Sequence, residues 1–301
     1  MGIILSNAAL LVKARQDNVC FDQILTIGHQ TSYLSQEQIR RLARRHGLKI
    51  DISVFHHQQY ADRFFEAFLG AKSVLSLDYS DYEGCDIIHD MNQPIDPTYH
   101  ERFDAVIDGG SLEHIFHFPM AMANCMQMIK KGGSLFLFTV ANNHTGHGFY
   151  QFSPELFFRI LQPDNGFEIR DLILEKHPFP GAELSPRTKC FSVVDPAVMK
   201  ERVGLVCSSP VMILIHAVRT EIKPVFAHYP IQSDYQSQYD NHVKHASDRP
   251  VDASFHASVK KLARRFLNLL PSRCRNFIDG RRQLWRYSFL NGRFYKRWYP
   301  L

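Results

Sequence analysis

Residues Phe103–Val140 read FDAVIDGGSLEHIFHFPMAMANCMQMIKKGGSLFLFTV, in which two apolar runs enclose one helical segment. The first run (FDAVID) and the last (SLFLFTV) are continuous and apolar, which is typical of strands buried on both faces of a parallel sheet. Between them, the apolar side chains of Pro119–Lys131 recur at helical spacing, which predicts a helix. Lysines stand in the last turn of this predicted helix. Strand, helix and strand in this order predict a β-α-β unit of an α/β fold.

The same alternation continues outward on both sides of this unit, as far as residue 220. A capping box at Ser35 and Gln38, and the pair Ser153-Pro154, mark the starts of two more helices. The remaining strands are predicted at Phe21–Gly28, Ser73–Asp78, Cys85–His89, Phe167–Leu174 and Val211–Arg219. We therefore expect a mostly parallel sheet with helices on both faces.

Charge divides the chain into two parts. The whole sequence carries +5, but residues 260–301 contain twelve Lys or Arg and one acid, Asp279, so residues 1–259 are net acidic at −6. Residues 225–258 lose the alternation and are rich in Gln, Ser, Asp, His and Tyr. We predict a folded domain over residues 1–224, a polar linker over 225–258, and a basic, helical C-terminal tail over 259–301 with a helix at Val259–Leu270.

The tail interleaves its cations with aromatic side chains. These are Phe277, Trp285, Tyr287, Phe289, Phe294, Tyr295, Trp298 and Tyr299. Cations beside interfacial aromatics favour an anionic membrane surface, where each charge adds about 1 kcal/mol. Nucleic acid is a second polyanion that stacking aromatics would serve. Docking on the acidic part of the chain or on a partner subunit is the third alternative.

Composition excludes several classes of protein. With 45% hydrophobic and 22% charged residues the chain can bury a core, and its apolar runs are far shorter than the roughly 20 residues of a membrane span. The six cysteines lack the clustering of a disulfide framework or a thiolate zinc site, so we expect reduced thiols in a cytoplasmic protein. The start Met1-Gly2 fits a myristoylation pattern, although an ordinary first helix through Lys13 and Arg15 is the favoured interpretation.

In an open parallel sheet, ligands bind beyond the carboxyl ends of the strands, near the point where the strand order reverses. The loops after the predicted strands hold Gly28-His29-Gln30, Asp78, Asp90-Met91-Asn92, Asp108-Gly109-Gly110-Ser111 and Asn142–Gly148. Because polar residues and glycines concentrate in these five loops, the sequence predicts a binding site along this edge.

The order of segments, and Phe103–Val140 above all, resembles the class I S-adenosylmethionine-dependent methyltransferases. FDAVIDGGSLEH is similar to the family's fourth strand and LEH turn, KKGGSLFLFTV to its Lys-Gly-Gly turn and fifth strand, and AKSVLSLDYS to its second strand. The resemblance covers about residues 20–220 and implies a Rossmann-like, seven-stranded sheet. The segment GHGFYQFSPELF (Gly146–Phe157) also resembles a bacterial subgroup associated with surface-polysaccharide genes.

The resemblance implies S-adenosyl-L-methionine as the cofactor and gives roles to residues of the five loops. Asp78 would accept hydrogen bonds from the ribose hydroxyls, with Asp51 as a rival because it lies nearer the usual spacing from the first strand. Asp90 would bind the adenine amine and Met91 its ring. Cofactor binding is also expected of Gly28, His29, Gln30, Asp108, Gly109, Gly110 and Glu113. The single glycine of the first loop departs from the family's G-x-G-x-G, which keeps a non-catalytic binding domain as an alternative.

Methyl transfer from a sulfonium is an in-line displacement, in which the protein aligns the nucleophile, the methyl group and the leaving sulfur. A hydroxyl acceptor also benefits from a base, so the candidate catalytic residues are His114, His144 and His147. Asn143, Phe149, Tyr150 and Gln151 are expected to bind the acceptor, because aromatic faces beside polar groups suit a sugar. No metal is predicted, since no carboxylate stands at ligand spacing from the histidines of Asn142–Gly148.

These expectations describe a cytoplasmic S-adenosylmethionine-dependent methyltransferase that O-methylates a sugar, a glycan or another small polar hydroxyl acceptor, with its tail at the inner face of the membrane. Two alternatives stay open. One is a non-catalytic, methyltransferase-like module that recruits a partner or a membrane through the tail. The other is a nucleic-acid methyltransferase that uses the tail as an electrostatic clamp.

Overall fold

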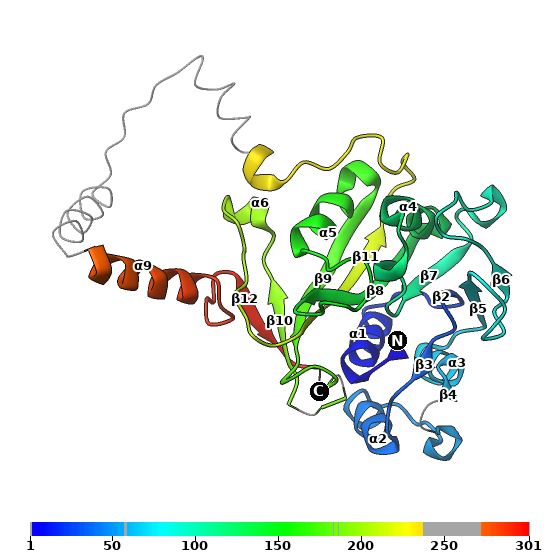
Figure 1. Cartoon of the computed structure of the whole chain (residues 1–301). Helices are drawn as coiled ribbons and strands as arrows, with labels where there is room; N and C mark the ends of the chain where they lie inside the picture. The colour runs from blue at the N-terminus through cyan, green and yellow to red at the C-terminus, as the bar shows by residue number, and fades with distance from the viewer. Residues whose placement is uncertain (1, 57–58, 183, 186, 237–271, 301) are drawn as a thin grey trace. The chain divides into compact units, whose positions relative to one another are not determined.

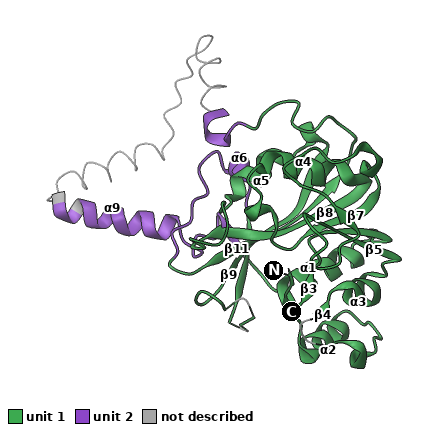
Figure 2. Cartoon of the chain, turned by 45° about the vertical axis from the view of Figure 1, so that its right-hand side comes forward, with its two compact units in different colours: residues 1–193, 208–230, 297–301 green, residues 194–207, 231–296 purple. Residues whose placement is uncertain are grey.

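A computed structural model describes residues 2–56, 59–182, 184–185, 187–236 and 272–300 of the chain (Figure 1). The chain splits into two compact units, one comprising residues 1–193, 208–230 and 297–301 and the other residues 194–207 and 231–296 (Figure 2). The predicted helix Val259–Leu270 and most of the predicted linker lie outside the described residues.

The main sheet has the strand order β12-β10-β9-β11-β8-β7-β2-β5-β6. Its parallel part consists of β2 (Gln23–Ile27), β5 (Ser73–Asp78), β6 (Ile87–Ile88), β7 (Phe103–Asp108) and β8 (Ile129–Asn142). β11 (Val211–Arg219) lies between β8 and β9 (Phe167–Lys176) and is antiparallel to both. The seven predicted strands are confirmed, and β10 (Lys189–Val193) and β12 (Tyr295–Trp298) extend the sheet beyond them.

The strand order reverses at β2. From β2 the chain crosses to β5 and β6 on one side, and it then returns to β7 and β8 on the other side. The crossovers on the two sides of β2 therefore diverge, so the carboxyl ends of β2, β5 and β7 flank the crevice in which sheets of this kind bind ligands. The arrangement confirms the predicted Rossmann-like fold class.

Helices cover both faces of the parallel strands, and Figure 1 shows α4 and α5 on one face and α1 on the other. Before β5 come α1 (Leu5–Gln16), α2 (Gln36–Arg45), α3 (Asp62–Phe64) and a π-helix at Phe65–Leu69, whereas α4 (Phe118–Met128) follows β7 and α5 (Pro154–Ile160) follows β8. Phe136 and Phe138 of β8 join Leu10 of α1 in one core cluster. Because side chains alternate along a strand, the buried Leu135 and Leu137 point to the opposite face.

Short elements complete the described chain. β1 (Gly2–Ile3), β3 (Thr31–Ser32) and β4 (Gln59–Tyr60) form a small second sheet. One-turn 3-10 helices lie at Ile52–Val54, Pro97–Tyr99, Leu112–His114 and Pro163–Asn165. α6 (Pro196–Met199) and α9 (Ser272–Arg286) belong to the second unit, and α9 confirms a helix in the described part of the tail. Among the helices that the structure describes, none has the length and apolar character needed to cross a membrane.

The helix ends test the local predictions. The capping box of α2 is present, with the Ser35 side chain accepting from the N–H of Gln38, and Ser153 caps α5. The prediction for α4 was wrong at its end, because the helix stops at Met128 and Lys130 and Lys131 belong to β8. These residues extend β8 because Ile129 pairs with Phe103 of β7 and Lys130 Nζ donates to Asp104 Oδ1 over 2.9 Å.

Candidate functional site

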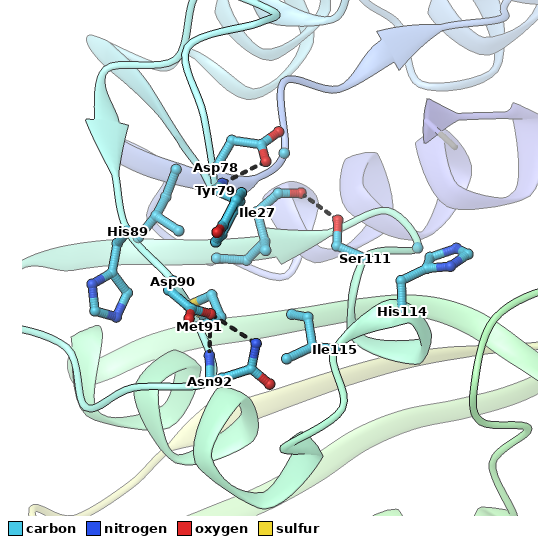
Figure 3. A pocket seen from close by; sticks show the side chains of 13 residues that line it. Ile27, Asp78, Tyr79, His89, Asp90, Met91, Asn92, Ser111, His114 and Ile115 are labelled. Carbon is cyan, nitrogen blue, oxygen red and sulfur yellow. Dashed lines mark hydrogen bonds between the residues drawn. The ribbon is translucent and has the colours of Figure 1, made fainter.

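A cavity of about 400 Å³ opens at the carboxyl ends of β2, β5, β6 and β7, at the point where the strand order reverses (Figure 3). Of the predicted site residues, it is lined by Gly28, Asp78, Asp90, Met91, Gly110 and His114. The other lining residues are Ile27, Leu77, Tyr79, His89, Asn92, Ser111 and Ile115. The loops that the sequence singled out thus converge on one cavity, as the sheet topology requires.

The floor of the cavity is the turn after β2, which is tied to both neighbouring strands. Gly28 has a φ of +74°, which favours glycine, and its N–H donates to the Leu77 carbonyl over 2.7 Å. From the turn after β7, Ser111 Oγ donates to the Ile27 carbonyl over 3.0 Å. These two bonds hold the ends of β2, β5 and β7 in register around the opening.

Asp78 is the acid that stands at the mouth of the cavity. Its Oδ1 accepts a hydrogen bond from the N–H of Tyr79 over 2.6 Å, and its Oδ2 lies 3.9 Å from the position that a Cβ on Gly28 would take. The rival acid, Asp51, instead caps the 3-10 turn Ile52–Val54, where its Oδ1 accepts from the N–H of Ser53. α2, the 3-10 turn and α3 form the insertion before β5 that separates Asp78 from β2 in the sequence.

The loop Asp90–Asn92 after β6 also lines the cavity. Asp90 Oδ1 accepts from the backbone N–H of Asn92 over 2.9 Å and from its Nδ2 over 2.7 Å, and these bonds lower the pKa of Asp90 (Figure 3). Met91 is buried beside them, at 5% exposure. Asn124 of α4 supports the loop from below, because its Nδ2 donates to the Gln93 carbonyl over 2.7 Å. This loop therefore places a fixed, ionised carboxylate next to an apolar side chain.

His29 and Gln30 were predicted to bind a cofactor, but the structure places both side chains away from the cavity lining. The His29 ring stacks on Tyr60 with centroids 3.4 Å apart. Gln30 is 4% exposed and donates through Nε2 to the Ile27 carbonyl over 2.6 Å. A Cβ on Gly109 would lie 1.9 Å from Gln30 Oε1, so the space that this glycine leaves is filled by Gln30. The Gln30 side chain therefore fills space at the first loop. The additional glycines of a G-x-G-x-G loop have no side chains and would leave such space empty.

Two predicted acids are fully buried here, Asp108 at the end of β7 and Glu113 in the turn after it. Asp108 accepts from the N–H groups of Ser111 (2.8 Å) and Leu112 (3.3 Å). Burial, and then the nearby Glu113, raises the pKa of Asp108 to about 7. Burial also raises the pKa of Glu113, whose Oε2 accepts from Thr139 Oγ1 over 2.7 Å. Asp108 therefore shapes the turn that carries Gly110 and Ser111 to the cavity.

The three candidate catalytic histidines are neighbours in space. The ring centroids of His114 and His147 are 5.2 Å apart, and those of His144 and His147 are 5.9 Å apart. Of the three, His114 lines the cavity. Burial, and then His147, lowers the pKa of His114, so its ring is neutral at pH 7 and can accept a proton. His147 Nε2 lies 3.6 Å from Glu113 Oε1.

The predicted acceptor-binding residues form the loop that follows these histidines. The N–H groups of Phe149 and Tyr150 both donate to the Glu113 carbonyl, and the Phe149 ring lies edge-on to Phe116 with both rings exposed. Gln151 Oε1 accepts from the N–H of His144, and Asn143 Nδ2 donates to the Ser209 carbonyl. Gln151 and Asn143 thus hold the loop, while Phe149 offers an open aromatic face.

Sequence reasoning missed Tyr79 as a lining residue, and it named Ser111 and Asn92 within the binding loops without giving either a role. Tyr79 is 73% exposed and follows Asp78 directly, so its position after a strand-end acid was the available signal. The bond from Ser111 to Ile27 joins two strands that are far apart in the sequence, and no local pattern reports it.

Comparisons with known proteins found solved structures of low similarity to this chain. No protein-family model and no curated protein matches the sequence. The Burkholderia thailandensis 1,6-didemethyltoxoflavin-N1-methyltransferase, solved with S-adenosylhomocysteine, is 12% identical over 71% of this chain and 77% of its own, with a TM-score of 0.37. The YcgJ protein of Bacillus subtilis is 10% identical over 71% of this chain and 98% of its own, with a TM-score of 0.38. The branched-chain polyamine synthase of Thermus thermophilus, solved with 5'-methylthioadenosine, is 12% identical over 75% of this chain and 60% of its own, with a TM-score of 0.36. Sequence identities and TM-scores this low assign no function to the chain, whereas the residues of the cavity are specific to it.

Proposed function

We propose that the cavity at the end of β2 binds S-adenosyl-L-methionine and that the chain is a methyltransferase. The observation that carries this proposal is that two carboxylates, from the ends of the neighbouring strands β5 and β6, line one 400 Å³ cavity at the reversal point of a parallel sheet. They are Asp78, the last residue of β5, and Asp90, which follows β6. A nucleoside has a vicinal diol at its ribose and an amine on its base, and each of these donors needs an acceptor of this kind.

The lining residues divide the cavity between the parts of such a cofactor. Asp78 would accept from the ribose hydroxyls, and Asp90 would accept from the adenine amine while Met91 packs on the ring. Tyr79 adds an exposed ring beside Asp78. The amino-acid portion of the cofactor would lie against the backbone of Gly28 and Gly110, which have no side chains in the way, and beside the hydroxyl of Ser111. When bound, the cofactor supplies an electrophilic methyl group, and the role of the protein is alignment and desolvation.

A hydroxyl group of a sugar, a glycan or another small polar molecule is the proposed acceptor. His114 lines the cavity with a neutral ring, which makes it the candidate base for an alcohol. The exposed faces of Phe116 and Phe149 lie next to this turn and suit the apolar face of a sugar ring. Release of S-adenosylhomocysteine in the presence of candidate sugars and nucleotide sugars, measured by mass spectrometry, tests the acceptor class.

Cofactor binding is tested by titration calorimetry with S-adenosylmethionine and S-adenosylhomocysteine. We expect the wild type to bind both ligands and Asp78→Asn to bind them about 10- to 100-fold more weakly, because two charge-assisted hydrogen bonds to the ribose are lost. Asp51→Asn is the matched control, since Asp51 is the rival acid and caps a 3-10 turn. Absence of binding by the wild type would contradict the methyltransferase proposal. A loss of ligand affinity in Asp51→Asn but not in Asp78→Asn would contradict the placement of the ribose at Asp78.

The tail supports a second, separate proposal, that the chain associates with the inner face of a membrane. On α9 the cations Arg273, Arg281 and Arg282 are exposed, and so are Phe277 (65%) and Trp285 (57%). A helix that offers both guanidinium groups and aromatic rings to its surroundings is suited to an anionic lipid surface. This association would hold the proposed enzyme close to lipid-linked acceptors.

A further inference from the structure

Two imidazoles and one carboxylate meet beside the cavity, on the turn after β7 and the loop after β8. Glu113, His114 and His147 each offer a ligand atom, and these three atoms all lie within 4.8 Å of one another. The closest approach that we measure is 3.6 Å, between Glu113 Oε1 and His147 Nε2. Two ligands at about 2.1 Å from one tetrahedral zinc ion stand about 3.4 Å apart, so this pair is already spaced as two ligands of one ion.

The buried carboxylate has a free acceptor on the side that faces the histidines. Glu113 is fully buried, and its Oε2 accepts from Thr139. Within the described residues, neither Glu113 Oε1 nor His147 Nε2 has a hydrogen-bond partner. An unsatisfied buried polar atom costs about 1–3 kcal/mol, and a cation between these two atoms would satisfy both of them.

The loop after β8 is shaped to hold His147 against Glu113. The N–H groups of Phe149 and Tyr150 donate to the Glu113 carbonyl over 2.8 and 3.2 Å. Gly148 has a φ of +101°, and a Cβ on it would lie 2.8 Å from that same carbonyl oxygen. Glycine at this position therefore permits the close approach. His114 follows Glu113 in the chain, and its ring lies beside that of His147 with the centroids 5.2 Å apart, so it offers the third ligand atom.

We propose that Glu113 Oε1, His147 Nε2 and a ring nitrogen of His114 bind one divalent first-row transition metal ion, with zinc as the reference ion. Two imidazoles and a carboxylate suit zinc or iron(II), whereas magnesium and calcium prefer sites made of oxygen atoms. Sites with three protein ligands keep a further position open for water or substrate. The proposal adds a metal site where the sequence alone predicted none.

The open position gives the ion a role in the proposed methyl transfer, and this step alone rests on the proposed function. His114 belongs to both the metal cluster and the cavity lining, so the ion lies where an acceptor hydroxyl would enter. Coordination would lower the pKa of that hydroxyl, so its proton would pass to solvent, and His114 would act as a ligand of the ion in place of the base role given to it above. The oxygen lone pair then forms the bond to the methyl carbon, and the electrons of the carbon–sulfur bond stay on sulfur as S-adenosylhomocysteine forms.

Metal binding is tested on the full chain, stripped with a chelator and free of any histidine tag. We titrate zinc against a chromophoric competitor, and we titrate cobalt(II) while recording its visible absorption, which reports the coordination geometry. We expect one tight zinc site per chain. Glu113→Gln, His114→Ala and His147→Ala are each expected to weaken it at least about tenfold, since each removes one of three ligands.

His144→Ala is the matched control, because His144 neighbours His147 on the same loop but is not part of the cluster. His147→Ala also guards against a folding artefact, since His147 is half-exposed on a loop whereas Glu113 is buried. Unchanged zinc affinity in all three ligand variants, or no zinc bound by the wild type, would overturn the proposal. Calorimetry with S-adenosylmethionine on the same stripped protein is read separately, so that failure of the metal site and failure of the proposed function give different results.

Discussion

At the scale of single residues, environment gives similar side chains different roles. Asp78 and Asp51 were the two candidates for the acid that binds the ribose, yet one stands at the cavity and the other caps a turn. His114 and His216 are both neutralised by burial, but His114 faces the cavity whereas His216 is 2% exposed inside the sheet. His216 stacks on Phe136, with its Nε2 3.2 Å from Ser134 Oγ. It is therefore a structural residue with a predictable effect on stability.

Burial lowers the pKa of His216 below that of an unfolded histidine, near 6.5. The unfolded chain therefore binds the proton more readily, and the stability that neutral His216 contributes is complete above pH 6.5 and is lost as the pH falls below it. We expect the free energy of unfolding in urea to drop between pH 7.5 and pH 5 in the wild type. His216→Phe keeps the stack on Phe136 and should flatten this slope, by up to about 1.4 kcal/mol per pH unit. The exposed His228→Phe is the control, and equal slopes in all three proteins would contradict the assignment.

At the scale of elements, the binding edge is built by loops that are bonded to one another. The turn after β7 is tied to β2 through Ser111 and Ile27, and it also receives the N–H groups of Phe149 and Tyr150 from the loop after β8. The predicted α5 begins at its Ser153 cap just beyond that loop. The proposed metal cluster therefore depends on the conformation of one glycine-containing loop.

Gly148→Ala tests this dependence. A methyl group at residue 148 meets the Glu113 carbonyl oxygen at 2.8 Å, so the loop must move away from the turn. We expect zinc affinity to fall at least about tenfold. We also expect faster hydrogen exchange at the amides of Phe149 and Tyr150, measured by NMR. Gly146→Ala is the control, because its φ is also positive (+89°) but its Cβ would meet nothing within 4 Å among the described residues, so it carries the backbone cost of about 1 kcal/mol alone.

At the scale of the whole molecule, the contrast is between an acidic main part and a basic tail. Residues 260–301 carry +11 and residues 1–259 carry −6. The described tail displays its arginines and aromatic rings on α9. A basic tail of this kind attracts anionic surfaces through its charge, which is the basis of the proposed membrane association.

We expect the full chain to co-sediment with vesicles that contain phosphatidylserine, and expect this binding to weaken with salt because surface charges are screened. The double variant Arg281→Glu/Arg282→Glu should bind at least about tenfold more weakly. Arg40→Glu/Arg44→Glu makes the same change of charge on exposed positions of α2 and should bind like the wild type. Retention on oligonucleotides but not on vesicles would instead support the nucleic-acid alternative.

Local sequence determined the strands, most helix starts and the loops that meet at the cavity. Continuous apolar runs, capping residues and glycines act over a few neighbouring positions, so Asp78, Asp90 and Gly110 were predicted together with the edge they occupy. The same local reasoning extended α4 too far, because the pairing of Ile129 with Phe103 is a long-range contact.

Tertiary structure alone decided which side chains meet. Gln30 fills the space beside Gly109, and Glu113 comes within 3.6 Å of His147, although each pair is far apart in the sequence. Spacing along the chain carries no record of such pairs, because they arise when parallel strands bring separate loops to one edge. For that reason the sequence pointed to a nucleoside site but to no metal, whereas the folded chain brings a buried carboxylate close to two histidines.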